Sequence, residues 1–231
     1  MRTLPRNDPR QYDDLVDEWW APRGGFAMLH WIAAARAQRI PPATPGAVLV
    51  DLACGGGLLA PHVTGYRHVG VDLGTAGLAL ARQHGVTPVC GDVLRLPLGD
   101  AVADVVVAGE VLEHVTDLDA AVREACRVLK PGGTLVLDTI ADTWFGRFSS
   151  ITVGERVPAG PPKRLHDPTL YVDRDRLRSL CADRGVALQL VGLRPAITDY
   201  LRWLAGRRED VRMLTTRSTA GLFQGWGVKS L

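Results

Sequence analysis

An aspartate followed by a run of glycines is the first place in this sequence where chemistry is expected. Asp51 ends a short apolar run and is followed by Ala53 and by glycines at 55, 56 and 57. Glycines allow a tight turn, and a ligand can approach their backbone closely because no Cβ stands in the way. A helix that begins here would also offer free N–H groups and the positive end of its dipole. The pattern predicts a ligand-binding turn.

Two further aspartates follow at intervals that suit a nucleoside. Asp72 ends a second apolar run, where a carboxylate can accept two hydrogen bonds from a ribose diol, and Leu73 comes next. Asp92 follows a third run and is placed to accept from an exocyclic amine of adenine, with Val93 against the ring. Each feature alone could be structural, since an aspartate can simply cap a helix. Together they favour a nucleoside-containing cofactor.

Glu110, Glu113 and His114 form a second group with chemical potential. If a helix begins near Glu110, the i, i+3, i+4 spacing places both carboxylates and the imidazole on one face. Three such ligands could hold a divalent cation beside a substrate oxygen, whose pKa the cation would lower. The alternative is structural, with Glu113 and His114 capping a helix against the sheet. Without a metal, His114, His30 or His166 could act as a general base.

These residues need a scaffold that brings the ends of several strands to one edge. Short apolar runs alternate with helical stretches up to residue 140, which is typical of βαβ units and a parallel sheet. In such sheets, ligands bind beyond the carboxyl ends of the strands. Strands are expected at 47–53, 68–72, 86–92, 103–110, 134–140, 186–193 and 221–230, and helices at 10–20, 26–39, 75–85, 117–130 and 172–185.

The predicted fold is therefore a single Rossmann-like α/β domain over residues 1–231. Its sheet is expected to have seven mostly parallel strands, an antiparallel last strand and helices on both faces. Residues 1–45 would form an N-terminal helical cap, and 46–140 the cofactor-binding core. Residues 141–168 would form a substrate lid, and 169–231 the C-terminal part of the sheet.

Composition narrows the class of protein. The chain has 231 residues, of which 46% are hydrophobic and 23% charged, as in an ordinary globular domain. It has no apolar run of the roughly 20 residues that a membrane span needs, and its N-terminus lacks the apolar centre of a secretory signal. A cytoplasmic location is expected. A formal charge of +2 gives no ground for a nucleic-acid partner, and four widely spaced cysteines indicate core thiols.

The glycine turn also distinguishes between cofactors. It lacks the G-x-G-x-x-G spacing of dinucleotide-binding enzymes, and no Lys-Ser or Lys-Thr follows it for phosphates. Asp51 would repel a pyrophosphate, whereas a carboxylate suits the amino group and sulfonium of S-adenosylmethionine. The sequence therefore favours methyl transfer. A C- or N-methyltransferase, or a non-catalytic protein that binds an adenosyl ligand, would share every cofactor residue.

On these residues the chain resembles the class I S-adenosylmethionine-dependent methyltransferases. Within them it is similar to the ubiquinone-biosynthesis O-methyltransferase (3-demethylubiquinol 3-O-methyltransferase) group. The resemblance rests on Trp19-Trp20 with Phe26, Leu29, His30 and Arg36, on residues 50–57, and on residues 110–115. It implies methyl transfer to a hydroxyl of an aromatic, catechol or quinol-like small molecule. It also implies Mg²⁺ or another divalent metal at Glu110, Glu113 and His114.

The resemblance further implies roles for individual residues. Arg36 would contact the methionine carboxylate, and the turn, Asp72 and the backbone of Gly109 would complete the cofactor site. The expected cofactor-binding residues are Arg36, Asp51, Ala53, Gly55, Gly57, Asp72, Leu73, Asp92, Val93 and Gly109, and the expected catalytic residues are His114 and Glu110. The family usually has glycine where this chain has Ala53, so a slightly displaced turn is expected.

The segment 141–168 is long for a connection and holds several aromatic and basic residues, which is typical of a functional lid. Trp144, Phe145 and Phe148 could cover an apolar ring or make peripheral contact with a membrane surface. The substrate lid is the preferred interpretation, because the segment shows no clear amphipathic helix. The expected partner is thus a hydroxylated aromatic small molecule, while the sequence leaves the oligomeric state open.

Overall fold

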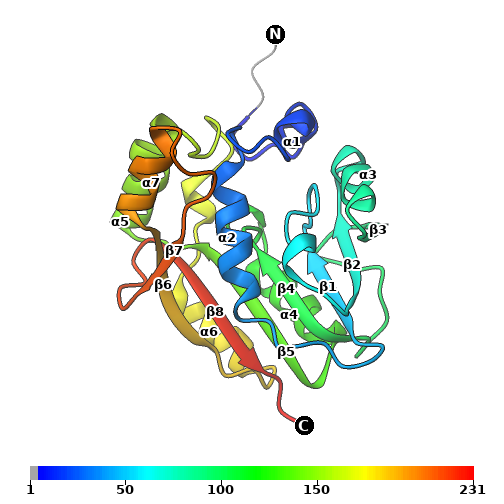
Figure 1. The fold of residues 1–231 in the computed structure, drawn as a ribbon. Coiled ribbons are helices and arrows are strands. Elements are labelled where there is room, and N and C mark those ends of the chain that lie inside the picture. The colour runs from blue at the N-terminus through cyan, green and yellow to red at the C-terminus, as the bar shows by residue number, and fades with distance from the viewer. Residues whose placement is uncertain (1–4) are drawn as a thin grey trace.

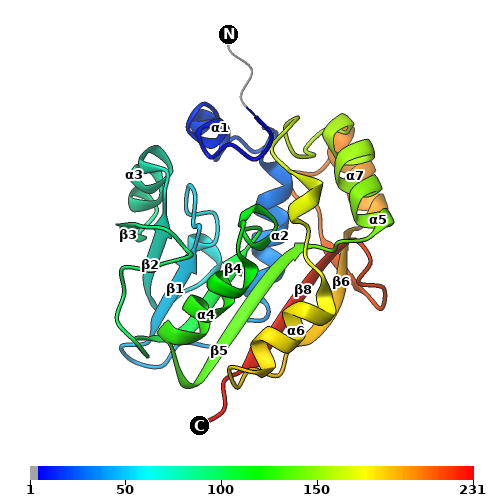
Figure 2. The ribbon, with the colours of Figure 1, turned by 180° about the vertical axis from the view of Figure 1, so that it is seen from behind.

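A mixed sheet of eight strands forms the centre of the molecule (Figures 1 and 2). The computed structural model describes residues 5–231, apart from the side chain of Asp13. The strands are β1 Val48–Leu52, β2 Arg67–Asp72, β3 Thr87–Cys90, β4 Ala103–Gly109, β5 Leu129–Ile140, β6 Gln189–Pro195, β7 Met213–Thr216 and β8 Leu222–Val228. Their order across the sheet is β3-β2-β1-β4-β5-β8-β6-β7.

Strand directions confirm the predicted Rossmann-like fold. The strands β1 to β5 pair in parallel, and the last strand, β8, lies antiparallel between β5 and β6. The expected number of seven strands was wrong, because β7 adds an antiparallel edge to β6. This strand is only four residues long, and its hydrogen bonds go to a strand some 20 residues earlier. The sequence of this segment therefore has little pattern from which a strand could be predicted.

Helices cover both faces of the sheet. The helices are α1 Arg10–Asp13, α2 Ala27–Ala37, α3 Thr75–Gln83, α4 Leu118–Val128, α5 Trp144–Arg147, α6 Arg174–Ala182 and α7 Ile197–Leu204. Helix α2 crosses one face, and α4 and α6 lie on the opposite one (Figures 1 and 2). The side chain of Asp117 caps α4 by accepting a hydrogen bond from the N–H of Ala120.

The predicted helix at 10–20 is wrong as a continuous element. Only α1 and a 3-10 turn over Val16–Glu18 are helical. Two aromatic residues of this segment pack on one ring outside it: Tyr12 stacks on Phe26 at 6.1 Å between ring centroids, and Trp19 stacks on it at 4.6 Å. These tertiary contacts override the helical spacing of the apolar residues.

The central strands hold the core. All five residues of β1 are buried, and Leu49, Val71, Val106 and Val136 are inaccessible to solvent or nearly so. A strand covered on both faces has no solvent side, which explains why these strands are continuous apolar runs.

The segment 141–168, which the sequence predicts to be a lid and which keeps that name below, is more regular than its sequence indicates. It continues from α5 into a π-helical turn over Phe148–Val153 and a 3-10 turn over Gly154–Arg156. Helices α5 and α7 lie side by side at one corner of the molecule in both views (Figures 1 and 2). Trp144 and Phe145 of the lid are 75% and 51% exposed. In residues 5–231, no helix has both the length and the apolar character to cross a membrane.

Candidate active site

A cavity of about 900 Å³ opens beyond the carboxyl ends of the central parallel strands. Nine of the ten residues expected to bind the cofactor line it: Arg36, Asp51, Ala53, Gly55, Asp72, Leu73, Asp92, Val93 and Gly109. The exception is Gly57, which turns toward α3. A Cβ at Gly57 would lie 2.9 Å from the Cα of Ala81. Its role is therefore to let the turn pack against that helix.

The glycine turn is shaped by left-handed backbone and covered by aromatic rings. Ala53 has φ +54° and Gly55 has φ +50°. Glycine adopts this conformation freely, whereas an L-residue pays about 1–2 kcal/mol. A Cβ at Gly55 would lie 2.2 Å from Cη2 of Trp19, so the indole rests directly on the glycine. Trp20 adds a hydrogen bond of 2.9 Å from Nε1 to the carbonyl of Gly56.

Asp72 is fixed by the backbone around it. Its Oδ2 accepts from the N–H of Gly55 and its Oδ1 from the N–H of Gly74, both at 2.8 Å. Burial raises the pKa of Asp72, while these backbone donors act in the opposite direction. Each carboxylate oxygen retains a second lone pair. The oriented carboxylate can therefore still accept from hydroxyl groups in the cavity.

Two other aspartates line the same cavity. Asp51 is buried and accepts a hydrogen bond from Nε2 of His68 at 3.3 Å. Asp92 is exposed, and its Oδ1 accepts from the N–H of Leu94 at 2.9 Å. The three carboxylates make this part of the cavity suited to a ligand with amino and hydroxyl groups.

Arg36 makes a buried ion pair that sequence reasoning missed. Its Nε donates to Oδ2 of Asp138 at 2.6 Å and its Nη2 to Oδ1 at 2.7 Å. Burial alone would lower the pKa of Arg36, but the Asp138 carboxylate raises it. A Cβ at Gly109 would lie 1.9 Å from Cζ of Arg36, so the guanidinium needs that glycine. Asp138 is an acidic residue in an apolar strand, and a buried carboxylate needs a partner. Its position in the sequence is therefore a signal from which a buried partner could have been predicted.

Glu110 does not begin a helix, contrary to the geometric argument made from its spacing. It has φ +52°, and only Leu112–His114 forms a 3-10 turn. The N–H of Glu110 donates to both the carbonyl and Oδ1 of Asp138, which holds this residue against β5. Burial, together with the neighbouring charges of Glu113 and Asp138, raises the pKa of Glu110 well above its usual value. Its Oε1 is buried without a hydrogen-bond partner.

Glu113 has one oxygen occupied and one free. Its Oε2 accepts from Oγ1 of Thr139 at 2.7 Å, whereas Oε1 is buried without a partner. Burial raises the pKa of Glu113 to about 7. Burial therefore favours the neutral form of this carboxyl group more than water does.

His114 is held in one tautomer by Asn7. The Nδ2 of Asn7 donates to the carbonyl of His114 at 2.9 Å, which fixes the orientation of the amide. The Oδ1 of Asn7 must then accept from Nδ1–H of His114, at 2.5 Å. This leaves Nε2 without a proton, 3.2 Å from the hydroxyl of Tyr12. Burial and nearby His166 lower the pKa of His114 well below its usual value, so the ring is neutral.

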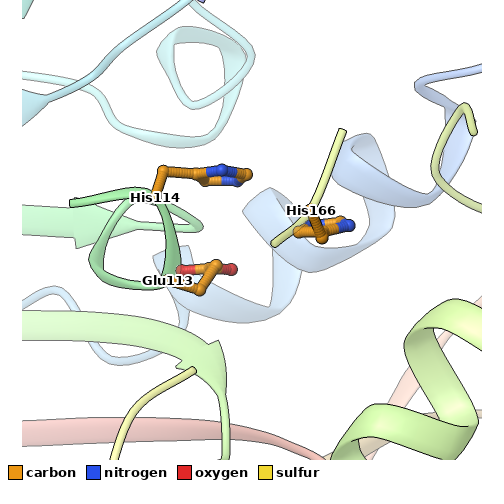
Figure 3. A group of neighbouring side chains, drawn as sticks. All are labelled: Glu113, His114 and His166. Carbon is orange, nitrogen blue, oxygen red and sulfur yellow. The ribbon is translucent and has the colours of Figure 1, made fainter. Parts of the chain in front are cut away.

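His166 approaches this group from the end of the lid. Its ring stacks on that of His114 with 5.0 Å between centroids, and burial lowers the pKa of His166 to about 4. Glu113, His114 and His166 each offer a ligand atom, all within 4.8 Å of one another (Figure 3). Glu110 is outside this group. His30 is outside it as well: it does not line the cavity, and its Nε2 donates to the carbonyl of Trp19.

Known proteins with related sequences and folds place the chain in a family. The profile of a methyltransferase domain matches residues 50–137. The ubiquinone biosynthesis O-methyltransferase of Hahella chejuensis is 32% identical over 205 residues, which cover 80% of this chain and 86% of that protein. The mitochondrial protein of the same name from Rattus norvegicus is 28% identical over 215 residues, 82% of this chain and 62% of that protein.

A solved structure shows the same fold. The protein from Thermotoga maritima described as an SAM-dependent methyltransferase, possible histamine N-methyltransferase, superposes with a TM-score of 0.66 at 18% identity. The match covers 95% of this chain and 97% of that one. With a 32% identical relative spanning four fifths of its length and a methyltransferase domain matched over its central strands, the chain belongs to the class I S-adenosylmethionine-dependent methyltransferases.

Proposed function

We propose that this methyltransferase methylates a hydroxyl group on an aromatic, catechol or quinol-like small molecule. The observation that carries the proposal is the tautomer of His114: a neutral imidazole turns its unprotonated Nε2 toward the hydroxyl of Tyr12. Both residues line the large cavity. A neutral imidazole near pH 7 can accept the proton of a phenol during methyl transfer. The relatives named for O-methylation in ubiquinone biosynthesis support the same acceptor chemistry.

The proposed cofactor contacts follow from the residues that line the cavity. S-adenosylmethionine supplies an electrophilic methyl group on a sulfonium when it is bound. Arg36 would hold the methionine carboxylate, because Asp138 occupies only its Nε–Nη2 edge. Asp51 would accept from the amino group and Asp72 from the ribose diol. Leu73, Asp92 and Val93 would receive the adenine, and the backbone of Ala53, Gly55 and Gly109 would complete the wall, with Gly57 supporting the turn from behind.

The acceptor would lie in the apolar part of the same cavity. Its lining here includes Phe26, Leu29, Ile140, Leu165 and Leu222. An aromatic ring gains free energy from leaving water in such surroundings, at about 25 cal/mol per Å² of apolar surface buried. Its hydroxyl would take the place of the Tyr12 hydroxyl at Nε2 of His114. Because alignment and exclusion of water are the main contributions to methyl transfer, the enclosed wall matters as much as the base.

The residues around His114 fit a divalent cation. The expected ligands are Glu110, Glu113 and His114, and two of them hold a buried oxygen with no partner, Oε1 of Glu110 and Oε1 of Glu113. Unpaired buried polar atoms are rare and call for a partner. A cation would occupy the same Nε2 lone pair, so it is the alternative to His114 as the base: its positive charge would favour ionisation of the acceptor hydroxyl. In this interpretation Glu110 is catalytic through its buried carboxyl group beside the acceptor.

The lid is proposed to cover the acceptor and to contact an apolar environment outside the cavity. Phe145 and Val153 line the cavity, while Trp144 is exposed beside them. A peripheral membrane surface is one such environment, since exposed aromatic rings insert into the interface region of a bilayer. Co-sedimentation with phospholipid vesicles tests this contact: wild type should sediment with vesicles, and Trp144→Ala should lose most of that binding.

Product analysis tests the proposed reaction. The enzyme is incubated with S-adenosylmethionine and either catechols and quinols or amines of the same ring size. Mass spectrometry should find methyl ethers with the hydroxylated rings, and His114→Asn should abolish them. Methylated amines alone would instead assign an N-methyltransferase, the activity given as possible for the Thermotoga maritima protein. C-methylated rings would overturn the hydroxyl assignment in the same way.

A further inference from the structure

Three metal-ligating side chains from two distant segments converge beside the cavity (Figure 3). Glu113 and His114 come from the turn after β4, and His166 comes from the end of the lid. Their ligand atoms lie within 4.8 Å of one another, and Figure 3 shows His166 reaching them from a separate segment of the chain. Ligand atoms bonded to one ion at about 2.0–2.2 Å are at most about 4.4 Å apart, so small rotations of these side chains would bring all three around one ion.

Two of these side chains bury a polar atom that has no partner. Glu113 is 0% exposed and His166 is 7% exposed. Within the part of the chain that the structure describes, Oε1 of Glu113 and Nδ1 of His166 both lack a hydrogen bond. Each such atom costs free energy in a folded protein unless something binds it. Thr139 holds the other oxygen of Glu113, so the free Oε1 is also oriented.

The third side chain, His114, has its tautomer fixed by a hydrogen bond to Asn7. Asn7 accepts the Nδ1–H of His114 and leaves Nε2 with a free lone pair. Metal-ligating histidines typically donate their other ring N–H to an oxygen in this way, which fixes the tautomer and the ring orientation. Among residues 5–231, the hydrogen-bond partner of that Nε2 is the Tyr12 hydroxyl, at 3.2 Å.

We infer that Glu113, His114 and His166 form a site for a transition-metal dication such as Zn²⁺, with His166 in place of Glu110 as the third ligand. Two imidazole nitrogens and one carboxylate oxygen suit Zn²⁺, Co²⁺ or Fe²⁺, whereas Mg²⁺ takes oxygen ligands and retains its waters. The inference depends on the proposed metal-assisted reaction for the role of the ion, but not for its ligands. Because His166 ends the lid, a bound ion would tie the lid to the sheet edge.

Calorimetry on the full chain after dialysis against chelator tests this site. Zn²⁺ and Co²⁺ should each bind with one equivalent, and Mg²⁺ should bind at least about 100-fold more weakly. Co²⁺ should also give visible absorption bands that report nitrogen ligands. His166→Gln should weaken Zn²⁺ binding by about 100-fold or more, and Asn7→Ala by about 10- to 100-fold.

Two controls separate the ligand sets. His62→Gln, which alters an exposed histidine outside the group of three, should leave Zn²⁺ affinity unchanged, and Glu110→Gln should weaken it far less than His166→Gln does. Thermal unfolding of each variant shows whether it still folds, and Co²⁺ absorption of the folded His166→Gln protein should lose its nitrogen-ligand character. Equal affinity for Mg²⁺ and Zn²⁺ would overturn the inference. Loss of binding in Glu110→Gln with normal binding in His166→Gln would overturn it as well.

The outcome can be read separately from the proposed reaction. Methyl ether formation in chelator, with no measurable Zn²⁺ binding, would refute the metal site and leave O-methyl transfer standing. Zn²⁺ binding that depends on His166, with no methyl ether from any hydroxylated ring, would support the site and refute the proposed acceptor.

Discussion

Replacing Asp138 by asparagine tests whether the buried pair with Arg36 builds the cofactor site. Asparagine keeps the shape and one acceptor oxygen but removes the charge that faces Nε and Nη2 of Arg36. Removing one member of a buried ion pair costs about 3–5 kcal/mol, and one hydrogen bond to a charged group contributes about 1.5–3 kcal/mol. Because one acceptor remains, Asp138→Asn should lower the free energy of unfolding by about 3 kcal/mol. Urea unfolding followed by tryptophan fluorescence measures this change.

The matched control is Asp100→Asn. Asp100 pairs with Arg127 at 2.6 Å, a distance equal to that of the buried pair, but its side chain is 79% exposed. Exposed pairs contribute about 0–1 kcal/mol, so this variant should unfold close to the wild-type midpoint. Equal destabilisation of the two variants would refute the importance of burial for the Arg36 pair.

The same variant should weaken cofactor binding. With asparagine at position 138, the guanidinium of Arg36 loses its charged partner and one of the two contacts that fix its plane over Gly109. If one charge-assisted hydrogen bond to the methionine carboxylate is lost, about 1.4 kcal/mol or more disappears, which is about a tenfold rise in Kd. Calorimetry with S-adenosylhomocysteine measures the affinity. Normal affinity in a folded Asp138→Asn protein would show that Arg36 needs no such positioning.

Three further substitutions test other parts of the site. Ala53→Gly should raise the free energy of unfolding by up to about 1 kcal/mol in urea, because it relieves a left-handed alanine at φ +54°; a loss of stability would contradict that strain. Gly109→Ala should weaken S-adenosylhomocysteine binding by more than about tenfold in calorimetry, since its Cβ would lie 1.9 Å from Cζ of Arg36. In His166→Gln, the free energy of unfolding measured in urea should fall less than in wild type as the pH is lowered. The pKa of His166 is lowered from 6.5 to about 4, so between these values the unfolded chain binds more protons and wild type loses up to about 3 kcal/mol as the pH falls. An equal loss of stability at acid pH in wild type and in His166→Gln would show that His166 is not buried as a neutral ring.

The parallel half of the fold was predictable because its signal is local. A strand buried on both faces must be apolar throughout, so β4 at Ala103–Gly109 falls within the predicted 103–110. The turn after β1 is equally local, since the glycines themselves permit its left-handed backbone. The edge strand β7 and the interruption of the helix near Tyr12 depend on distant partners. The neighbouring residues in the sequence therefore do not predict them.

The chemistry of the site divides in the same way. Asp72 could be found because its strand ends there, and its backbone donors lie within the adjoining turns. The contact of Asn7 with His114 spans 107 residues, and that of Arg36 with Asp138 spans 102. Spacing alone predicted a helix from Glu110 onward, whereas the chain adopts a positive φ there, and the approach of His166 to Glu113 and His114 had no signal in the sequence. Such pairings exist only after the sheet and lid have assembled.

The indole that rests on Gly55 gives the enzyme an intrinsic optical probe. Of the six tryptophans, Trp19 covers the glycine turn and Trp20 is hydrogen-bonded to it. A ligand that enters beside that turn alters the polarity around these two fluorophores, and emission changes with occupancy. Stopped-flow experiments can then follow arrival and departure of the methyl donor on the unlabelled protein and reveal whether product escape or chemistry sets the turnover.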